Sequence, residues 1–479
     1  MTAVGRDSTP PGVVVREGVY GEKVAAVEPG GVGFIPLNER HGRPLQLLWT
    51  WTSPNLEFAT IFLGVLAVAA FGLSFWQAVG AIVVGTGLGA ITHAVLSARG
   101  PRHGVAQMVL SRVPFGFRGN VLPAGLNSLT AGIGWFAVNS VSATFALNTL
   151  TDLPKPLCLL IVVAVQVAIA FFGHNLVQAF ERYAFPVLAV VFVIASVIIL
   201  SKADVGAPAA PGPGGVGGFL IMVAATFGYT AGWNPYAADY TRYLAPDSDR
   251  RAVGLFAGLG VFASCVILEV VGAASVTIGG KALDDPTGAF TGHLPSVIAD
   301  LTLLAITLGA VSANALNIYS GSMSFVTLGI RLPLPHRVQR AMVALILGTV
   351  GLVVAYFGLH DAGQNYEAFL LVITYWIGPW LGVVLADYYL RRGTPIDHLL
   401  YDTRHRNWAG PIAMAAGVVL SVWLFSNQEK YVGLVPDHVS SVGDLTFEAG
   451  FLIAATLYVL LRPLRRMTSA SAQDTSANV

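Results

Sequence analysis

Long apolar runs recur along the chain and define its predicted architecture. A helix needs about 20 apolar residues to cross the hydrocarbon core of a bilayer, and twelve stretches come close to that requirement. They lie at 45–71, 75–98, 121–148, 155–174, 183–201, 216–240, 252–277, 297–326, 338–358, 366–390, 408–425 and 447–462. The pattern therefore predicts an all-α polytopic membrane protein with twelve transmembrane helices.

The basic residues between these runs predict the orientation of the chain. If the N-terminus lies inside, all but four of the 27 Lys and Arg residues fall on the cytoplasmic side, and the outside keeps Lys155, Lys202, Lys281 and Lys430. Cytoplasmic loops of membrane proteins carry such an excess of positive charge. We therefore expect a multi-pass protein of the plasma or inner membrane with both termini in the cytoplasm.

The polar segments are too short to form a second domain. Residues 1–44 lack the apolar region of a signal peptide, which predicts a flexible cytoplasmic tail. We expect a core of ten helices at 45–391, helices 11 and 12 at 392–462 and a cytoplasmic C-terminal tail at 463–479. Any chemistry must then take place inside the helix bundle.

Composition narrows the class of function. The chain is 54% hydrophobic and 11% charged, its formal net charge is +1 and its mean hydropathy is +0.67, so the lipid bilayer is the expected partner and nucleic acid is not. A Walker loop, a metal-spaced His/Cys cluster and a nucleophile elbow are all missing from the sequence. These absences argue against ATP-driven transport, against an enzyme and against a bound metal or other cofactor.

Two predicted helices are interrupted by residues that break helices. The first carries WTWTSPNLEF at 49–58, and the sixth carries GYTAGWNP at 228–235. If helices 1–5 and 6–10 form an inverted repeat, these breaks occupy corresponding positions, and such a pair indicates a binding site near the middle of the membrane. The alternative is that each proline only kinks a packed helix.

Amide side chains add to the candidate site. Trp135 and Asn139 are four residues apart, and therefore on one face of the third helix. An aromatic ring beside a carboxamide suits a flat polar ligand. Asn314 and Asn317, just after Ser312, share a face of the eighth helix, where they would either bind a ligand or hold helices together.

Ionisable residues within the spans are candidates for cation coupling. Glu57 follows the break in the first helix, and Glu269 lies near the middle of the seventh. Intramembrane carboxylates are rare and mark ion or proton pathways; the alternative is a structural hydrogen-bond partner. Asp239 and Arg242 fall at the cytoplasmic end of helix 6, where an exposed ion pair or a gate is expected.

Several motifs resemble one known family. They are NERHGRPLQLLW (38–49), SRVPFGFRGNVLP (111–123), GWFAVN (134–139), the stretch FGYTAGWNPYAADYTRYL (227–244) and NALNIYS (314–320). In this order they resemble the nucleobase:cation symporter family, in its purine and cytosine permease branch. The resemblance implies the 5+5 inverted-repeat fold of the bacterial leucine transporter, alternating access and inward uptake of a nucleobase.

The resemblance also implies roles for individual residues. Trp135 would stack on the ligand, and Asn139 and Asn317 would read its edge. Tyr229 and Trp233 are both candidates for the aromatic wall from helix 6, and Ser53 and Asn55 would line the site from helix 1. The ligand would be cytosine, a purine or a related heterocycle; allantoin, hydantoin, a vitamin or an amino acid is the alternative, and a channel or a membrane enzyme is the alternative of a different class.

One departure from the family pattern bears on the co-transported cation. Sodium-coupled relatives use two adjacent hydroxyl residues on helix 8, and here the pair is Ser312 and Ala313. Hard cations take several oxygen ligands, and one is missing. The sequence therefore favours a co-transported proton over sodium, with Glu57 as the first candidate carrier and Glu269 as the second.

Overall fold

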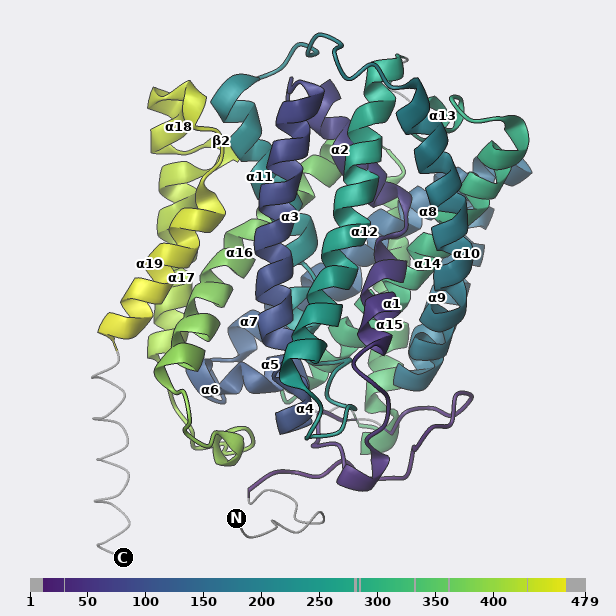
Figure 1. Ribbon diagram of the computed structural model, residues 1–479. Helices are drawn as coiled ribbons and strands as arrows, with labels where there is room; N and C mark the ends of the chain where they lie inside the picture. The colour runs from purple at the N-terminus through teal and green to yellow at the C-terminus, as the bar shows by residue number, and fades with distance from the viewer. Residues whose placement is uncertain are drawn as a thin grey trace, which may run out of the picture.

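The computed structural model describes residues 12–29, 31–279, 282–283, 286–330, 333–360, 362–428 and 430–461. Helices dominate this part of the chain and form a single bundle (Figure 1). Within the described residues, nine helices are long and apolar enough to cross a membrane, and the bent pair Gln46–Asn55 and Phe58–Ala69 would make a tenth. Two further apolar helices, Ala409–Phe425 and Thr446–Leu460, are shorter.

Helices occupy every one of the spans expected from the apolar pattern. They are α1 (Gln46–Thr52), α2 (Phe58–Ala69), α3 (Phe75–Ser97), α7 (Val121–Leu129), α8 (Phe136–Thr151), α9 (Lys155–Phe172), α10 (His174–Lys202), α11 (Gly215–Ala231), α12 (Arg250–Ile278), α14 (Ser296–Thr327), α15 (His336–Gly358), α16 (Ala362–Leu390), α17 (Ala409–Phe425) and α19 (Thr446–Leu460). Helix α10 begins nine residues before its predicted start, at His174 instead of 183. The reason is Gly173, which turns the chain sharply (φ 101°) directly after α9.

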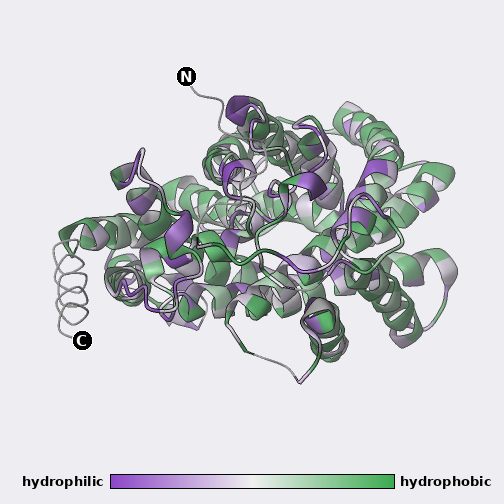
Figure 2. Cartoon of the chain, turned by 90° about the horizontal axis from the view of Figure 1, so that it is seen from below, coloured by the Kyte–Doolittle hydropathy of each residue, from purple (hydrophilic) through white to green (hydrophobic). Residues whose placement is uncertain are grey.

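Short elements connect these helices. They are η1 (Leu37–Glu39), η2 (Ser53–Asn55), α4 (Gly100–His103), α5 (Gln107–Leu110), α6 (Arg112–Phe115), η3 (Thr130–Trp135), η4 (Asn234–Tyr236), α13 (Pro286–Thr291), η5 (Asp397–Leu399), β1 (Asn427–Gln428), β2 (Tyr431–Val432), α18 (Leu434–His438) and η6 (Ser440–Val442). The two strands pair antiparallel as a small hairpin. Seen from below, the helices are mostly coloured as hydrophobic (Figure 2), as expected of a bundle that faces lipid.

The first span is broken where the sequence predicts. Residues Ser53–Asn55 form a 3-10 turn, Glu57 is extended (φ −148°, ψ 173°), and the chain bends by 58° between the two halves. Backbone groups freed by a break must be satisfied inside the protein. Asn55 does this from both sides, since its Nδ2 donates to Trp51 O at 2.7 Å and its carbonyl accepts from Thr60 Oγ1 at 2.7 Å.

The sixth span ends in a different way. Helix α11 stops at Ala231, and Pro235 lies in the 3-10 turn η4, after which turns continue until α12 begins at Arg250. The side chains from Met222 to Leu244 are all buried. This irregular backbone is therefore enclosed by protein, which is the condition under which a membrane protein tolerates it.

Two glycines allow helices α2 and α12 to approach closely. A Cβ on Gly64 of α2 would lie 1.7 Å from the carbonyl oxygen of Glu269 on α12, and a Cβ on Gly272 would lie 1.9 Å from that of Ile61. Small residues permit such backbone contact between membrane helices. Helices α2 and α12 therefore pack as one unit, to which α3 is joined through its own contacts with α12 and α11.

The N-terminal segment differs from the flexible tail predicted for residues 1–44. Among the described residues, 12–29 and 31–44 lie against the lower end of the bundle (Figure 1). Main-chain bonds fix the segment, including Ile35 N to Gly104 O at 3.0 Å and Glu28 N to Phe172 O at 2.8 Å. Tyr20, Phe34 and Ile35 are at most 2% exposed. These buried side chains explain why a mostly polar stretch is ordered.

Glu28 is the electrostatic centre of this segment. Its carboxylate lies 2.9 Å from Arg242 Nη2, 3.6 Å from Arg16 Nη1 and 3.7 Å from Arg340 Nε. Burial alone would raise the pKa of Glu28, but the three arginines outweigh burial and lower that pKa from 4.5 to about 2. The segment is thus pinned to the bundle by one carboxylate shared among three cations.

The same contacts correct the expectation for Asp239 and Arg242. Both side chains are at most 1% exposed, so they do not form an exposed pair. Arg242 binds Glu28 and donates to Tyr319 Oη at 2.9 Å, whereas Asp239 accepts from Gln107 N at 2.8 Å. Arg242 therefore pairs with Glu28, which is distant in sequence, instead of with Asp239.

Replacing Glu28 should destabilise the protein in a pH-dependent way. Glu28→Gln removes the carboxylate that pairs with the buried Arg242 and Arg340, while Arg16 keeps Glu39 as a partner. Breaking a buried pair costs about 3–5 kcal/mol. Because the pKa of Glu28 is lowered to about 2 in the folded state, the deficit relative to wild type should be full above about pH 5 and should shrink as the pH falls below about 4.5.

Denaturant unfolding of purified protein at several pH values measures this deficit. Glu17→Gln, an exposed carboxylate on the same segment, is the matched control and should be close to wild type. A Glu28→Gln deficit that grows on acidification would contradict the assignment.

Candidate functional site

A small cavity lies where the two broken spans meet the third. It has a volume of about 10 Å³ and is lined by Glu57, Trp135, Asn139, Tyr229, Gly232, Trp233, Tyr236 and Asn317. A cavity of this volume has room for about one water molecule, so the lining side chains have to move apart before a ligand can enter.

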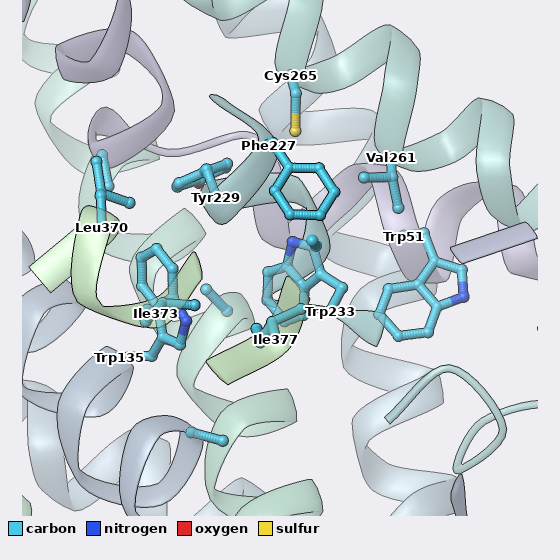
Figure 3. Packing of buried hydrophobic residues seen from close by; sticks show 14 of the residues in the cluster. Trp51, Trp135, Phe227, Tyr229, Trp233, Val261, Cys265, Leu370, Ile373 and Ile377 are labelled. Atoms are coloured by element: carbon cyan, nitrogen blue, oxygen red, sulfur yellow. The ribbon is translucent and has the colours of Figure 1, made fainter. Parts of the chain in front are cut away.

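Aromatic rings form much of its wall. Figure 3 shows Trp135, Tyr229 and Trp233 gathered between the helices. The rings of Trp135 and Tyr229 meet edge to face, with centroids 5.4 Å apart and an interplanar angle of 85°. A Cβ on Gly232 would lie 3.1 Å from Trp135 Nε1, so this glycine lets the broken backbone of helix 6 approach the indole.

The indole of Trp233 is held in place from helix 1. Its Nε1 donates to Asn55 Oδ1 at 2.9 Å, and its ring meets that of Trp51 at 5.8 Å between centroids. Asn55 and Ser53 are both fully buried, and neither lines the cavity. Asn55 therefore positions an aromatic wall residue, although the sequence suggests direct contact with a ligand.

The three asparagines form one hydrogen-bonded group. Asn314 Oδ1 accepts from Asn139 Nδ2 at 3.2 Å and from Asn317 Nδ2 at 3.3 Å. Asn314 Nδ2 in turn donates to Phe136 O at 2.8 Å. Asn314 lies behind the cavity wall and orients the two asparagines that line it. Asn317 therefore lines the cavity, whereas Asn314 bonds α14 to α8.

Tyr236 is a wall residue that the sequence analysis does not single out. Its hydroxyl donates to Asn317 Oδ1 at 2.8 Å, so both polar atoms of Asn317 are engaged. Tyr236 lies in the NPY turn directly after the break in helix 6. Its position could have identified it from the sequence, because the binding sites of such transporters are formed at the breaks of interrupted helices.

Two acceptor atoms of the wall have no partner among the described residues. They are Asn139 Oδ1 and Glu57 Oε2, both buried. The other oxygen of Glu57 accepts from Tyr229 Oη at 3.2 Å. Buried polar atoms are nearly always hydrogen-bonded, so a cavity with two open acceptors is suited to a ligand that presents N–H or O–H donors.

The remaining candidates lie outside the cavity. Glu269 Oε2 accepts from Thr86 Oγ1 at 2.9 Å, between α12 and α3. Ser312 Oγ donates to Glu181 Oε2 at 2.6 Å and lies 3.2 Å from Ser53 Oγ. Glu181 escapes the sequence analysis because the predicted span begins at 183, which leaves this residue beside Arg182 in a connecting loop.

Sequence comparison identifies a family. Residues 34–450 match the family described as permease for cytosine/purines, uracil, thiamine, allantoin. A putative purine-cytosine permease, YxlA, of Bacillus subtilis is 28% identical over 465 residues, covering 94% of this chain and 98% of the relative. The purine-cytosine permease fcyB of Emericella nidulans is 27% identical over 458 residues, covering 91% and 88%.

Structure comparison agrees on the fold. Mhp1, a nucleobase-cation-symport-1 family transporter in a closed conformation with bromovinylhydantoin bound, superposes with a TM-score of 0.72 at 22% identity, covering 94% of this chain and 96% of Mhp1. A Na+-coupled sialic acid symporter in an outward-open state superposes with a TM-score of 0.61 at 12% identity, covering 88% and 90%. The bundle thus has the fold of these transporters.

The bond between Trp233 and Asn55 yields a testable effect on stability. Trp233→Phe keeps an aromatic ring but leaves the buried Asn55 Oδ1 without a donor, which costs about 1–3 kcal/mol. Thermal unfolding in detergent should show a clearly lowered midpoint. Trp423→Phe, whose ring is 51% exposed on α17, should leave the midpoint near that of wild type. Equal midpoints for the two variants would show that the bond does not support the site.

Proposed function

The chain belongs to the purine–cytosine permease branch of the nucleobase:cation symporters, and on that premise we propose that it imports cytosine or a purine together with a proton. This is a family of transporters, and its members are not enzymes. Import would proceed by alternating access, in which the site opens to one side of the membrane at a time. The substrate would be delivered unchanged.

The two unpartnered acceptors of the cavity wall support a nucleobase as the substrate. Asn139 Oδ1 and Glu57 Oε2 would each accept a hydrogen bond from the ligand. Cytosine offers a ring N–H and an exocyclic amino group, and purines offer a similar set of donors. A flat molecule with donors along its edge can satisfy both acceptors while its faces contact aromatic rings.

Trp135 and Trp233 are proposed as the two stacking walls. Inserting a planar base between two rings requires them to be about 7 Å apart. Tyr229 already touches Trp135 edge to face at 5.4 Å, and its hydroxyl is engaged with Glu57 and Thr60. We therefore assign Tyr229 to holding Glu57 in place and Trp233 to stacking. Each stack is worth about 1–3 kcal/mol.

The membrane topology is proposed on charge. Twelve spans, arranged as a 5+5 inverted repeat followed by two further helices, would place both termini on the same side. The lower end of the bundle, where the N-terminal segment packs, would face the cytoplasm, because basic residues accumulate in cytoplasmic loops. The short helices α4, α5 and α6 and the loop 391–407 would lie on that side.

Hydantoin or allantoin is the second candidate substrate. The structure of Mhp1 has bromovinylhydantoin bound, and a hydantoin permease of Microbacterium maritypicum is 25% identical over 445 residues. A hydantoin ring carries two N–H groups and would also satisfy two acceptors. The vitamin and amino-acid alternatives have no comparable support from the cavity.

A competition experiment separates these substrates. The protein is reconstituted in liposomes, and uptake of labelled cytosine is measured with excess unlabelled cytosine, adenine, hypoxanthine, hydantoin or allantoin. Strong inhibition by a nucleobase supports the proposal, and inhibition by hydantoin or allantoin alone supports the second candidate. If none of the five binds in a parallel thermal-shift assay, the proposal is wrong.

Replacing Asn139 should weaken uptake. Asn139→Leu removes the open acceptor, and losing one buried hydrogen bond of about 1–3 kcal/mol corresponds to a roughly 5- to 150-fold loss of affinity. Uptake of labelled cytosine at a range of concentrations should show a raised KM. Thr149→Val, on the exposed side of the same helix, is the control and should behave as wild type. An unchanged KM in Asn139→Leu would remove Asn139 from the site.

A further inference from the structure

We propose that Glu181, on α10, is the group that binds the transported proton and couples it to substrate movement. The inference rests on the proposed function, since it assumes proton symport. It assigns the proton to a carboxylate outside the substrate cavity and leaves Glu57 to bind the substrate. Glu181 is buried, accepts a hydrogen bond and lies between two groups of helices.

Glu181 belongs to a short chain of hydrogen bonds that ends at the break in helix 1. Its Oε2 accepts from Ser312 Oγ on α14 at 2.6 Å, and Ser312 Oγ lies 3.2 Å from Ser53 Oγ. Ser53 is the first residue of η2, at the break itself. A change in the protonation of the carboxylate therefore affects hydrogen bonds that join three elements: α10, α14 and the broken span.

The other carboxylate oxygen is open. Glu181 is fully buried, and its Oε1 has no hydrogen-bond partner within the described residues. A buried charge without a cationic partner is strongly disfavoured, whereas a proton on Oε1 neutralises the group and leaves the bond from Ser312 to Oε2 intact.

No charged side chain compensates Glu181 among the described residues. The helices packed against α10 are α1, α9, α12 and α14, together with η2. Their buried titratable side chains are Cys158 on α9, Cys265 and Glu269 on α12 and Tyr319 on α14, and none of these four bonds to Glu181. Their charged side chains Lys155, Arg250, Arg251 and Asp300 are exposed. On α10 itself, His174 is buried at the first residue and Arg182 is exposed. Among the described residues, these side chains therefore supply no positive charge to Glu181.

The geometry favours a proton over sodium. Hard cations are held by about six oxygen ligands, and the side chains here supply two carboxylate oxygens and two hydroxyls, because Ala313 offers none. The Glu181 and Ser312 oxygens are already in direct hydrogen-bond contact at 2.6 Å. A metal ion would have to separate them, whereas a proton would not.

Glu57 and Glu269 are also buried with one unpartnered oxygen, so the position of Glu181 is what distinguishes it. Unlike Glu57, it does not line the cavity. Glu269 bonds to Thr86 within the unit of α2, α3, α11 and α12, whose members all pack on one another. Helices α8, α9, α14 and α15 form another such set. Glu181 reaches α14 of that second set and, through Ser312, the break in helix 1, whose flanking helices pack on α12. Protonation there acts across the boundary between the two sets.

In each transport cycle, Glu181 binds one proton and releases it. The ionised carboxylate takes one proton on Oε1 from the side with the higher proton concentration and becomes a neutral acid. Substrate binding and reorientation follow, and the acid releases the same proton on the other side. One proton moves with each substrate, and no covalent bond other than O–H forms or breaks.

Glu181→Gln is the decisive variant, because the amide is neutral and of the same shape. In liposomes with an imposed pH gradient and no sodium gradient, wild type should accumulate labelled cytosine several-fold above the external concentration. Glu181→Gln should reach only equal concentrations inside and outside. It should still exchange labelled for unlabelled cytosine, since exchange needs no net proton transfer. Glu181→Asp should restore accumulation in part.

Glu448→Gln is the matched control, since Glu448 is a partly buried carboxylate on α19, and it should accumulate cytosine as wild type does. Full accumulation by Glu181→Gln would overturn the proposal, as would wild-type accumulation driven by a sodium gradient alone. Loss of accumulation with retained exchange in Glu269→Gln, but not in Glu181→Gln, would move the proton site to Glu269.

The outcomes also separate this proposal from the proposed function. If wild type neither exchanges nor accumulates any nucleobase, the proposed function is wrong. If wild type exchanges nucleobases but a pH gradient does not drive their accumulation, only the proton-binding role of Glu181 is wrong. If Glu181→Gln does not bind cytosine in a thermal-shift assay, the uptake experiment is carried out with Ser312→Ala instead. Removing that donor disfavours the ionised carboxylate, so the pH profile of uptake should move to higher pH; an unmoved profile contradicts the proposal.

Discussion

The need to satisfy backbone polar groups inside a membrane underlies the organisation of this protein. A proline and its neighbours break the first span at Ser53–Asn55, and the freed groups have to find partners within the bundle. Asn55 supplies them through its side chain and its carbonyl and also binds Trp233. The same residue that repairs the backbone therefore fixes one wall of the cavity, so the cost of breaking the helix and the order of the site are linked.

The polar groups around the cavity are arranged in two tiers. Asn314 and Tyr236 use their hydrogen bonds on other protein groups, whereas the wall residues Asn139 and Glu57 each keep one acceptor without a partner among the described residues. A site with every acceptor filled would have no means of recognition, whereas one with many open acceptors would be costly to fold. Two open acceptors between aromatic walls are a compromise suited to a small planar ligand.

Much of this arrangement could be predicted from the sequence. Trp135 and Asn139 share a helix face by spacing alone, and the two broken spans identify themselves by proline and glycine, so six of the eight wall residues are among those the sequence singles out, with Gly232 noted as part of a break. The divided roles of Asn314 and Asn317, and of Asn55, could not be predicted, because their partners come from distant segments. Glu181 was missed because a hydropathy window ends a helix where polar residues begin, although α10 continues back to Gly173.

The N-terminal segment has a consequence for where the folded unit begins. The family match starts at residue 34, so a domain boundary drawn from that match alone would discard Arg16 and Glu28. Cutting there would remove the shared anion and leave Arg242 and Arg340 buried with no opposite charge from that segment. A truncation that keeps this cluster of charges therefore has to begin upstream of Arg16, well before the start of the family similarity.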